Sequence, residues 1–194
     1  MAKKNTFSTR EEWLVAFMDA SRPIFKQHGY ELPENIRVSI GFPSKGAKSK
    51  TIGECWQSEA SEDDAVEIFI TPGMGSAARI ADILTHELIH ALGIRGHKAD
   101  FKKCMLAVGL AGKPTATVAG DGWWEWAQPI LDKLGPLPHA ALAGNSTNGK
   151  KKQTTRMLKC ECQHCGIVFR TSAKHVERVG RCPDLFCDGQ INIG

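Results

Sequence analysis

The run His-Glu-Leu-Ile-His at residues 86–90 constrains this chain more than any other feature of its sequence. An α-helix has about 3.6 residues per turn, so side chains four positions apart lie on the same face. On a helix, His86 and His90 can therefore bind one metal ion, and Glu87 follows the first ligand directly. The pattern predicts a zinc site in which Glu87 acts as general base on a zinc-bound water.

The residues around this run also favour a helix. Residues 77–85 are good helix formers, and apolar residues recur at helical spacing: Ile80, Ile83, Leu84, Leu88 and Ala91. Ser76 is a suitable N-cap, and Gly93 and Gly96 are suitable stop signals. We therefore expect the histidines beside the buried face of a well-formed helix. The alternative is an ordinary amphipathic helix with two surface histidines and a glutamate.

His97 is the candidate third ligand. A second helix over residues 98–109 would place His97 near its N-terminal end, and the glycines before it allow the chain to fold back. The side chains expected to point inward from this helix are Phe101, Met105 and Val108. Three protein ligands and one open water position distinguish catalytic from structural zinc. We therefore predict a catalytic Zn²⁺ held by His86, His90 and His97.

The N-terminal part predicts one more helix and three strands. Ser8 and Glu11 have the spacing of a capping box at the start of an amphipathic helix that ends near Gln27. Its core candidates are Trp13, Leu14, Phe17, Ile24 and Phe25. The β-rich segments that follow are residues 36–42, 52–57 and 66–71. Helices and a small three-stranded sheet place this part of the chain in the α+β class.

Two further elements have open interpretations. The strand at residues 66–71 could lie at the sheet edge nearest the metal and hold an extended peptide, or it could be an internal strand with no role in recognition. A helix over residues 122–134 carries Trp123, Trp124 and Trp126. Tryptophans at this density indicate core packing, with substrate binding as the alternative.

Length and cysteine usage bound the organisation of the chain. Its 194 residues fit one domain with a small appendage better than two equal domains. We expect a metal-binding domain at residues 1–140, a linker at 141–156 and a second module at 157–194. The number of cysteines, seven, is odd, and five of them lie in the last 35 residues. Both facts favour thiolate-bound zinc in a reducing cytosol over disulfides. No apolar run has the length of a membrane span, and the N-terminus lacks a secretory signal.

The C-terminal cysteines predict a small β-rich zinc ribbon. Cys162 and Cys165 have the spacing of a zinc knuckle, and Cys182 with Cys187 can supply the second pair. Four thiolates leave no open position, so this second Zn²⁺ would be structural. Three residues could stand outside or substitute in this set: Cys160, a spare thiol, and His164 and His175. The remaining two cysteines, Cys55 and Cys104, are most simply buried small hydrophobic residues.

Charge separates the two parts of the chain. Residues 1–144 hold 16 Lys and Arg against 17 Asp and Glu, a net charge of −1, whereas residues 145–194 hold 9 against 4, a net charge of +5. The basic residues of the tail are Lys150, Lys151, Lys152, Arg156, Lys159, Arg170, Lys174, Arg178 and Arg181. They are suited to contact DNA phosphates without reading bases, and the alternative is a solubilising surface. No recognition helix or aromatic ladder is evident.

These motifs resemble the SprT-like (Spartan-related) metalloproteases, in particular the short bacterial and bacteriophage members. The resemblance covers roughly residues 50–190 and rests on His-Glu-Leu-Ile-His-Ala at 86–91, Gly-His-Lys-Ala-Asp-Phe-Lys at 96–102 and the basic ribbon. It also includes Glu-Ile-Phe-Ile-Thr-Pro at 67–72, residues 115–120, 138–142 and 155–159. In this chain the gap between His90 and His97 is shorter, and the second cysteine pair wider, than in better-studied members.

The resemblance implies a zincin-like minimal metalloprotease domain that acts on DNA-associated proteins, including proteins crosslinked to DNA. It assigns His86, His90 and His97 to the zinc and Glu87 to catalysis. The expected partners are DNA and DNA-bound proteins rather than a membrane, for a monomer in the cytoplasm near the nucleoid, or in the host cytoplasm for a viral protein. Candidates for stabilising the oxyanion are Arg79, Arg95 and His139. Two rival functions are a non-catalytic DNA-binding or transcription-associated protein and a regulatory peptidase that cuts one repressor.

Overall fold

A three-stranded sheet forms one wall of the first part of the chain in the computed structural model, which describes residues 6–47, 49–142, 157–176 and 178–193. Its strands are β1 (Ile36–Ile40), β2 (Gly53–Trp56) and β3 (Val66–Ile70), in the order β1-β3-β2. β3 pairs in parallel with β1 and antiparallel with β2. The three segments expected as strands therefore form one sheet, each shorter than expected.

Of the two positions considered for the third strand, the internal one is confirmed and the edge one is wrong. β3 is the central strand, because its alternating apolar side chains Val66, Ile68 and Ile70 are buried while both of its backbone edges are paired. The edge strand beside the histidine helix is β2, whose sequence Gly-Glu-Cys-Trp has no such apolar alternation. Any peptide that adds to this edge would therefore pair with β2.

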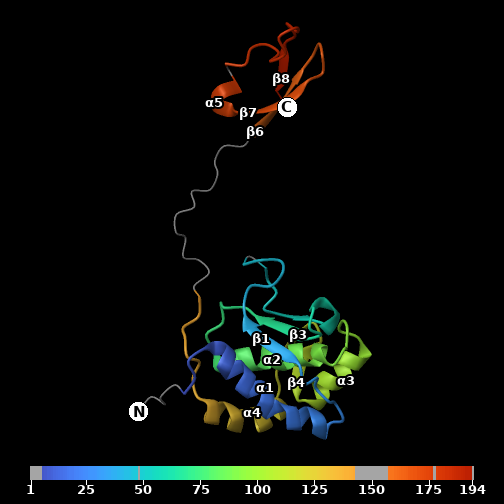
Figure 1. Cartoon of the computed structure of the whole chain (residues 1–194), viewed down its shortest axis with the longest axis vertical. Coiled ribbons are helices and arrows are strands. Elements are labelled where there is room, and N and C mark those ends of the chain that lie inside the picture. The colour runs from blue at the N-terminus through green and yellow to red at the C-terminus, as the bar shows by residue number, and fades with distance from the viewer. Residues whose placement is uncertain (1–5, 48, 143–156, 177, 194) are drawn as a thin grey trace. The chain divides into compact units, whose positions relative to one another are not determined.

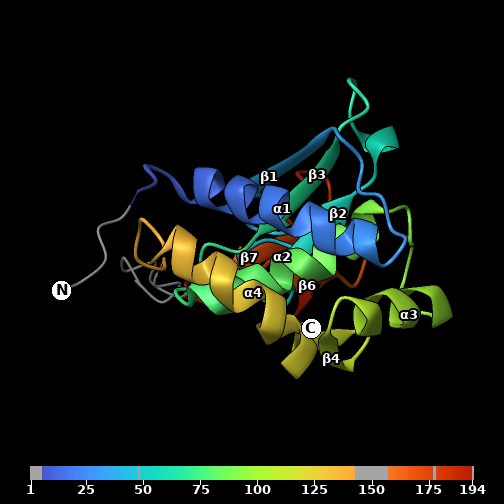
Figure 2. The same ribbon diagram turned by 90° about the horizontal axis from the view of Figure 1, so that it is seen from below.

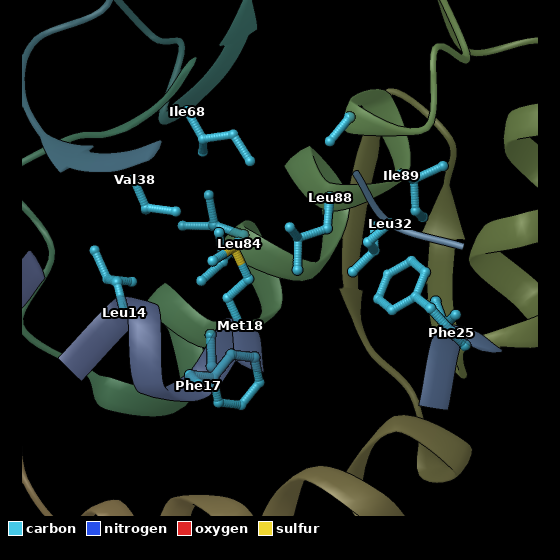
Figure 3. Close-up of a cluster of buried hydrophobic side chains, with 14 of the residues drawn as sticks. Leu14, Phe17, Met18, Phe25, Leu32, Val38, Ile68, Leu84, Leu88 and Ile89 are labelled. Carbon is cyan, nitrogen blue, oxygen red and sulfur yellow. The ribbon is translucent and has the colours of Figure 1, made fainter. Parts of the chain in front are cut away.

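Two helices cover one face of the sheet. α1 (Arg10–Gln27) packs against β1, and α2 (Ala77–Ala91) packs against β2 and β3. Figure 3 shows Leu14, Phe17 and Met18 of α1 facing the strand residues Val38 and Ile68, with Leu84 and Leu88 of α2 in the same cluster. α4 (Asp121–Leu134) packs on α1 and lies on the side of these helices away from the sheet (Figures 1 and 2).

The start of α1 differs by one residue from the expected capping box. Thr9 is the N-cap, and its side chain accepts a hydrogen bond from the backbone N–H of Glu12 while Glu12 accepts from the backbone of Thr9. Ser8 also donates its backbone N–H to Glu12, at 2.7 Å. Four of the five core candidates on this helix are buried, and Ile24 is half-buried.

A hairpin that the sequence did not predict follows the histidine helix. After α3 (Ala99–Ala107), β4 (Leu110–Lys113) pairs with β5 (Ala116–Ala119). Gly109 allows the close approach of this hairpin to α4, because a Cβ there would lie 2.1 Å from the backbone nitrogen of Trp123. Trp123 is buried and donates its ring N–H to the Thr85 hydroxyl at 3.0 Å. Core packing is therefore confirmed for Trp123 and in part for the half-buried Trp126, whereas Trp124 is exposed.

The second part of the chain has its own small sheet. β6 (Met157–Cys162) lies between β7 (Val168–Ser172) and β8 (Ile191–Ile193), and the short helix α5 (Ala173–Val176) follows β7. The chain divides into two units, Met1–Gly144 and Asn145–Gly194. Most of the expected linker lies outside the described residues. No helix in the described ranges combines the length and the apolar character needed to cross a membrane.

Candidate metal centre and adjoining cavity

Three histidine side chains converge at the C-terminal half of α2. His86 and His90 project from α2, and His97 lies two residues before the start of α3. The Nε2 atom of His97 is 3.1 Å from Nε2 of His86 and 3.2 Å from Nε2 of His90. These three side chains form a group that could hold a metal ion, so the structure brings together the three ligands expected from sequence.

The nitrogen geometry fits a tetrahedral zinc ion. Ligands that lie about 2.0–2.1 Å from a tetrahedral zinc are about 3.3 Å from one another, close to the separations of 3.1 and 3.2 Å between His97 and the other two histidines. The Nδ1 atom of His90 lies 2.8 Å from the carbonyl oxygen of Ile94, which can only accept, so Nδ1 of His90 carries the proton. The Nε2 atom of His90 is then unprotonated, and its lone pair is free to bind a metal ion in the group.

Two contacts fix the ring of His86. The Thr117 hydroxyl on β5 lies 2.9 Å from Nδ1 of His86, which leaves Nε2 as the ligand atom. The buried ring of Phe101 packs against all three histidines, with its centroid 4.7 Å from those of His86 and His90 and 4.8 Å from that of His97. Burial, followed by the neighbouring histidines and Arg79, lowers the pKa of His86 to about 3. The ring is accordingly held in its neutral, metal-binding form.

Glu87 is buried against the edge strand. Only 6 % of Glu87 is exposed, and its side chain lies so close to β2 that a Cβ on Gly53 would be 2.5 Å from its Oε1 atom. Glycine is therefore required at this position of the strand if Glu87 is to keep its place. Burial, and to a smaller extent the charge of Glu54, raises the pKa of Glu87 to about 8.

A cavity of about 690 Å³ opens beside the histidines. Its walls come from β2 and the residues 50–52 before it, from the face of α2 that carries the histidines, and from residues 95–97 and 115–117. His86, Glu87, His90 and His97 all line it. A ligand in this cavity can therefore reach the metal-binding atoms and the carboxylate at the same time.

One side of the cavity holds a connected polar network. Arg79 donates through Nη1 to both carboxylate oxygens of Asp82 at 2.8 Å and to the backbone oxygen of Thr117 at 3.2 Å. Asp82 also accepts the backbone N–H of Ala119 at 3.2 Å. Burial raises the pKa of Asp82, while the hydrogen bonds from Arg79 act in the opposite direction. The network fixes the hairpin that carries Thr117 against α2.

The oxyanion candidates are not equivalent. Arg79 and Arg95 both line the cavity, and Arg95 is also paired with Glu59 at 2.8 Å. His139 is not among the described residues that line it, and its backbone oxygen accepts a hydrogen bond from Arg10. No sequence motif identified Thr117 or Gly53 as a site residue. Thr117 lies in a segment that carries the family resemblance, which is the only signal that pointed to it.

The second unit contains a four-cysteine group. The Sγ atoms of Cys162 and Cys187 are 3.7 Å apart, and those of Cys165 and Cys182 are 3.5 Å apart. Disulfide sulfurs lie about 2.0 Å apart, whereas thiolates about 2.3 Å from a tetrahedral zinc are about 3.8 Å apart. All four cysteines are free and could hold a metal ion. Their arrangement fits the four ligands expected for a structural zinc.

Backbone hydrogen bonds shape the first cysteine knuckle. The N–H of Gly166 donates to the carbonyl oxygen of Cys162 at 3.0 Å, and the N–H of His164 donates to its sulfur at 3.4 Å. Backbone donors, first that of Cys165, lower the pKa of the Cys162 thiol to about 6. Gly189 must be glycine here, because a Cβ would lie 2.5 Å from the sulfur of Cys162. The backbone donors favour the thiolate form of Cys162, whereas burial raises the pKa of the Cys182 thiol to about 12.

The other cysteines and histidines stand outside these two groups. Cys160 is fully buried on β6 but is not part of the metal-binding group in the described residues. His164 and His175 are exposed and do not belong to it either. Cys104 is fully buried, as expected, whereas Cys55 is half-buried and lines the cavity. Burial raises the pKa of the Cys55 thiol to about 12, which keeps it protonated.

Five of the nine basic residues expected to contact DNA can be placed. Lys159, Arg170, Lys174, Arg178 and Arg181 are exposed on the second unit. Lys159 and Arg170 face each other across β6 and β7, and Lys159 is also 3.1 Å from Glu161. Lys150, Lys151, Lys152 and Arg156 lie outside the described residues. The structure therefore places one adjacent pair of these cations on a common face.

Comparison with known proteins adds no relative. No protein-family model matches the chain, and no curated protein or solved structure does so either. Membership of the SprT-like family, a zincin-like fold and a zinc ribbon therefore remain predictions from the sequence. What the structure establishes is a mixed α+β chain with a three-histidine group and a four-cysteine group that could each hold a metal ion.

Proposed function

We propose that the chain is a zinc-dependent endopeptidase of the SprT-like type that acts on DNA-associated proteins. His86, His90 and His97 would hold a catalytic zinc, and the four cysteines of the second unit a structural one. The observation that carries this proposal is the convergence of three histidine Nε2 atoms and the Glu87 carboxylate on one cavity. A structural zinc site would be closed by a fourth protein ligand, whereas this site borders open space.

The chain's own residues supply the acid–base chemistry. A zinc ion in this site would polarise a peptide carbonyl and make a coordinated water more acidic. The positive charge of a zinc ion beside Glu87 would oppose the effect of burial on its pKa and favour the carboxylate, which takes the proton from the attacking water and passes it to the nitrogen of the departing amine. The side chain is held for this task by its packing against Gly53 on one side and by the helix that it shares with His86.

The edge strand offers a place for the substrate backbone. β2 pairs with β3 on one side only, and its residues Gly53, Glu54 and Cys55 line the cavity. An extended peptide that adds to this edge forms main-chain hydrogen bonds that do not depend on its sequence. This mode of binding suits an enzyme that meets many different DNA-bound proteins.

The basic second unit supports recruitment to DNA. Its exposed cations, including the adjacent pair Lys159 and Arg170, are suited to phosphate contacts. Because the two units belong to one chain, binding of one unit to DNA raises the local concentration of DNA-bound proteins around the other. The proposal therefore predicts cleavage that is stimulated by DNA.

The test compares wild type with Glu87→Gln, both loaded with zinc, on a DNA-binding protein with no DNA, single-stranded DNA or double-stranded DNA. We expect the wild type to cleave faster with DNA, and Glu87→Gln to bind the same amount of zinc without cleaving. Full cleavage by Glu87→Gln would disprove the role of Glu87. DNA binding without cleavage by the wild type would favour a non-catalytic protein, and cleavage of one repressor without DNA stimulation would favour a regulatory peptidase.

A further inference from the structure

The cavity extends beyond the metal-binding group to an arginine. Arg79 lines it from the first turn of α2, seven residues before His86. Seven residues are close to two helical turns and correspond to about 10 Å along the helix, so both side chains lie on the same face. Arg79 is hydrogen-bonded to the backbone oxygen of Thr117, whose hydroxyl contacts His86, so its guanidinium lies beside the position of a peptide carbonyl bound at the metal. It is suited to a side chain or chain end that flanks this carbonyl.

Hydrogen bonds fix the guanidinium of Arg79 but leave N–H donors available to a ligand. Within the described residues, its hydrogen bonds to Asp82 and Thr117 all use Nη1. A guanidinium has five N–H donors in a fixed fork, which matches the two oxygens of a carboxylate. The side chain retains 34 % of its exposure, whereas that of Asp82 retains only 6 %. Asp82 therefore orients the arginine from the buried side, and the accessible part faces the cavity.

More cations than acids line the cavity, and Arg79 and Arg95 are each paired with an acid outside this lining, Asp82 and Glu59. The lining contains Lys50, Arg79 and Arg95 as cations and Glu54 and Glu87 as acids, before any metal is counted. Arg95 is a weaker candidate for anion binding, because its side chain is 70 % exposed and paired with Glu59. Charges so exposed are screened by water and salt, whereas a half-buried, oriented guanidinium is screened less.

We infer that Arg79 forms a subsite for a substrate carboxylate next to the bond that is cleaved. The carboxylate is either the side chain of Asp or Glu close to this bond or the free C-terminus of a short peptide. This inference rests on the proposed peptidase function and names a substrate preference for it. The backbone contacts along β2 accept any sequence, and Arg79 adds selectivity at one position.

The first experiment measures kcat/KM for matched peptides that carry Glu, Gln or Lys at each position flanking the cleaved bond. A second set of peptides ends in a free carboxylate or an amide, placed at the same distance from the cleaved bond. A charge-assisted contact predicts that wild type prefers Glu over Gln by about 10- to 100-fold at one position. Preference for the free C-terminus over the amide, without preference for internal Glu, would assign the subsite to the chain end.

Variants identify the residue responsible. Arg79→Gln should bring the ratio of Glu to Gln peptides close to one, and Arg79→Lys should keep part of it, because the charge remains without the fork. Arg95→Gln removes a charge from the same cavity and should leave the ratio as in wild type. Ratios taken within one variant are independent of its zinc occupancy. An unchanged ratio in Arg79→Gln, or a wild-type ratio near one, overturns the subsite and leaves the peptidase proposal intact.

A binding measurement separates this inference from the proposed function. Fluorescence anisotropy with zinc-loaded Glu87→Gln reports the affinity for the same peptides without cleavage. Tighter binding of the carboxylate peptides, lost in the double variant with Arg79→Gln, supports the subsite even if the wild type cleaves nothing. In that case only the peptidase function fails. If no peptide is bound or cleaved, the subsite fails, and the peptidase proposal also fails if the DNA-binding protein is not cleaved.

Discussion

The Thr117 hydroxyl lies 2.9 Å from Nδ1 of His86, although 31 residues separate the two in the chain. Because Nδ1 has a partner in Thr117, Nε2 of His86 is left to face the other two histidines. Thr117 is itself fixed through its backbone oxygen by Arg79. The orientation of a ligand on α2 therefore depends on a hairpin that lies beyond α3.

Loss of this hydroxyl should weaken metal binding without unfolding the protein. Thr117→Val keeps the shape of the side chain but leaves Nδ1 of His86 without its partner, and such changes lower metal affinity by about 10- to 100-fold. Thr117→Ser retains the hydroxyl and should bind zinc nearly as well as wild type. Competition with a chromophoric chelator gives the affinities, and thermal unfolding of the metal-free proteins gives their stability. Equal zinc affinity in Thr117→Val and wild type would contradict this role.

Gly53 should not tolerate a side chain. A Cβ in Gly53→Ala would lie 2.5 Å from Oε1 of Glu87 and 2.8 Å from Cγ2 of Ile83, so the strand or the glutamate must move. We expect a loss of about 1–3 kcal/mol in the free energy of unfolding and a fall in proteolysis greater than that in zinc affinity. Urea unfolding and a peptidase assay measure these effects.

The matched control is Gly73→Ala, where the nearest atom would be 3.9 Å from the new Cβ. Its effect on the free energy of unfolding should stay within about 0.5 kcal/mol. If Gly53→Ala is as stable and as active as this control, Glu87 does not need the close approach of β2.

The helix and its ligands were predictable because the signals are local. His86 and His90 have the spacing of one helical face. The apolar stripe lies in the same fifteen-residue helix, and Ser76 caps it. Ser8 and Thr9 each have a glutamate three residues later, so the sequence offers two capping boxes one residue apart. The structure uses Thr9, and the pattern alone did not distinguish them.

The tertiary partners were not predictable in the same way. Nothing in the composition of residues 110–119 predicts that β5 brings Thr117 to His86, because the hairpin is short and its position depends on the packing of Gly109 against Trp123. Strand order is also a tertiary property. The apolar alternation of β3 indicates burial, but only its pairing with both β1 and β2 makes it central.

The four-cysteine group should hold its own metal ion. Cys187→Ser removes one thiolate, so the zinc content should fall from about two ions per chain to about one, and the second unit should lose its ordered structure. Cys160→Ser changes a buried cysteine of the same unit outside the group and should keep both ions. Metal analysis after gel filtration measures the content. Loss of an ion in Cys160→Ser with retention in Cys187→Ser would mean that Cys160 is the fourth ligand.

Contact of the second unit with DNA should depend on Lys159 and Arg170. The two residues are cross-strand partners on β6 and β7, so they can meet the same phosphate backbone. Each lost phosphate contact lowers the slope of log affinity against log salt by about 0.9, so Lys159→Gln with Arg170→Gln should lower it by about 1.8 for any DNA sequence.

Glu161→Gln should strengthen binding, because Glu161 is paired with Lys159. Lys102→Gln with Lys103→Gln removes the same charge from exposed positions of α3 and should leave the slope unchanged. If both double variants behave alike in titrations at several salt concentrations, the cations of the second unit serve solubility and not DNA binding.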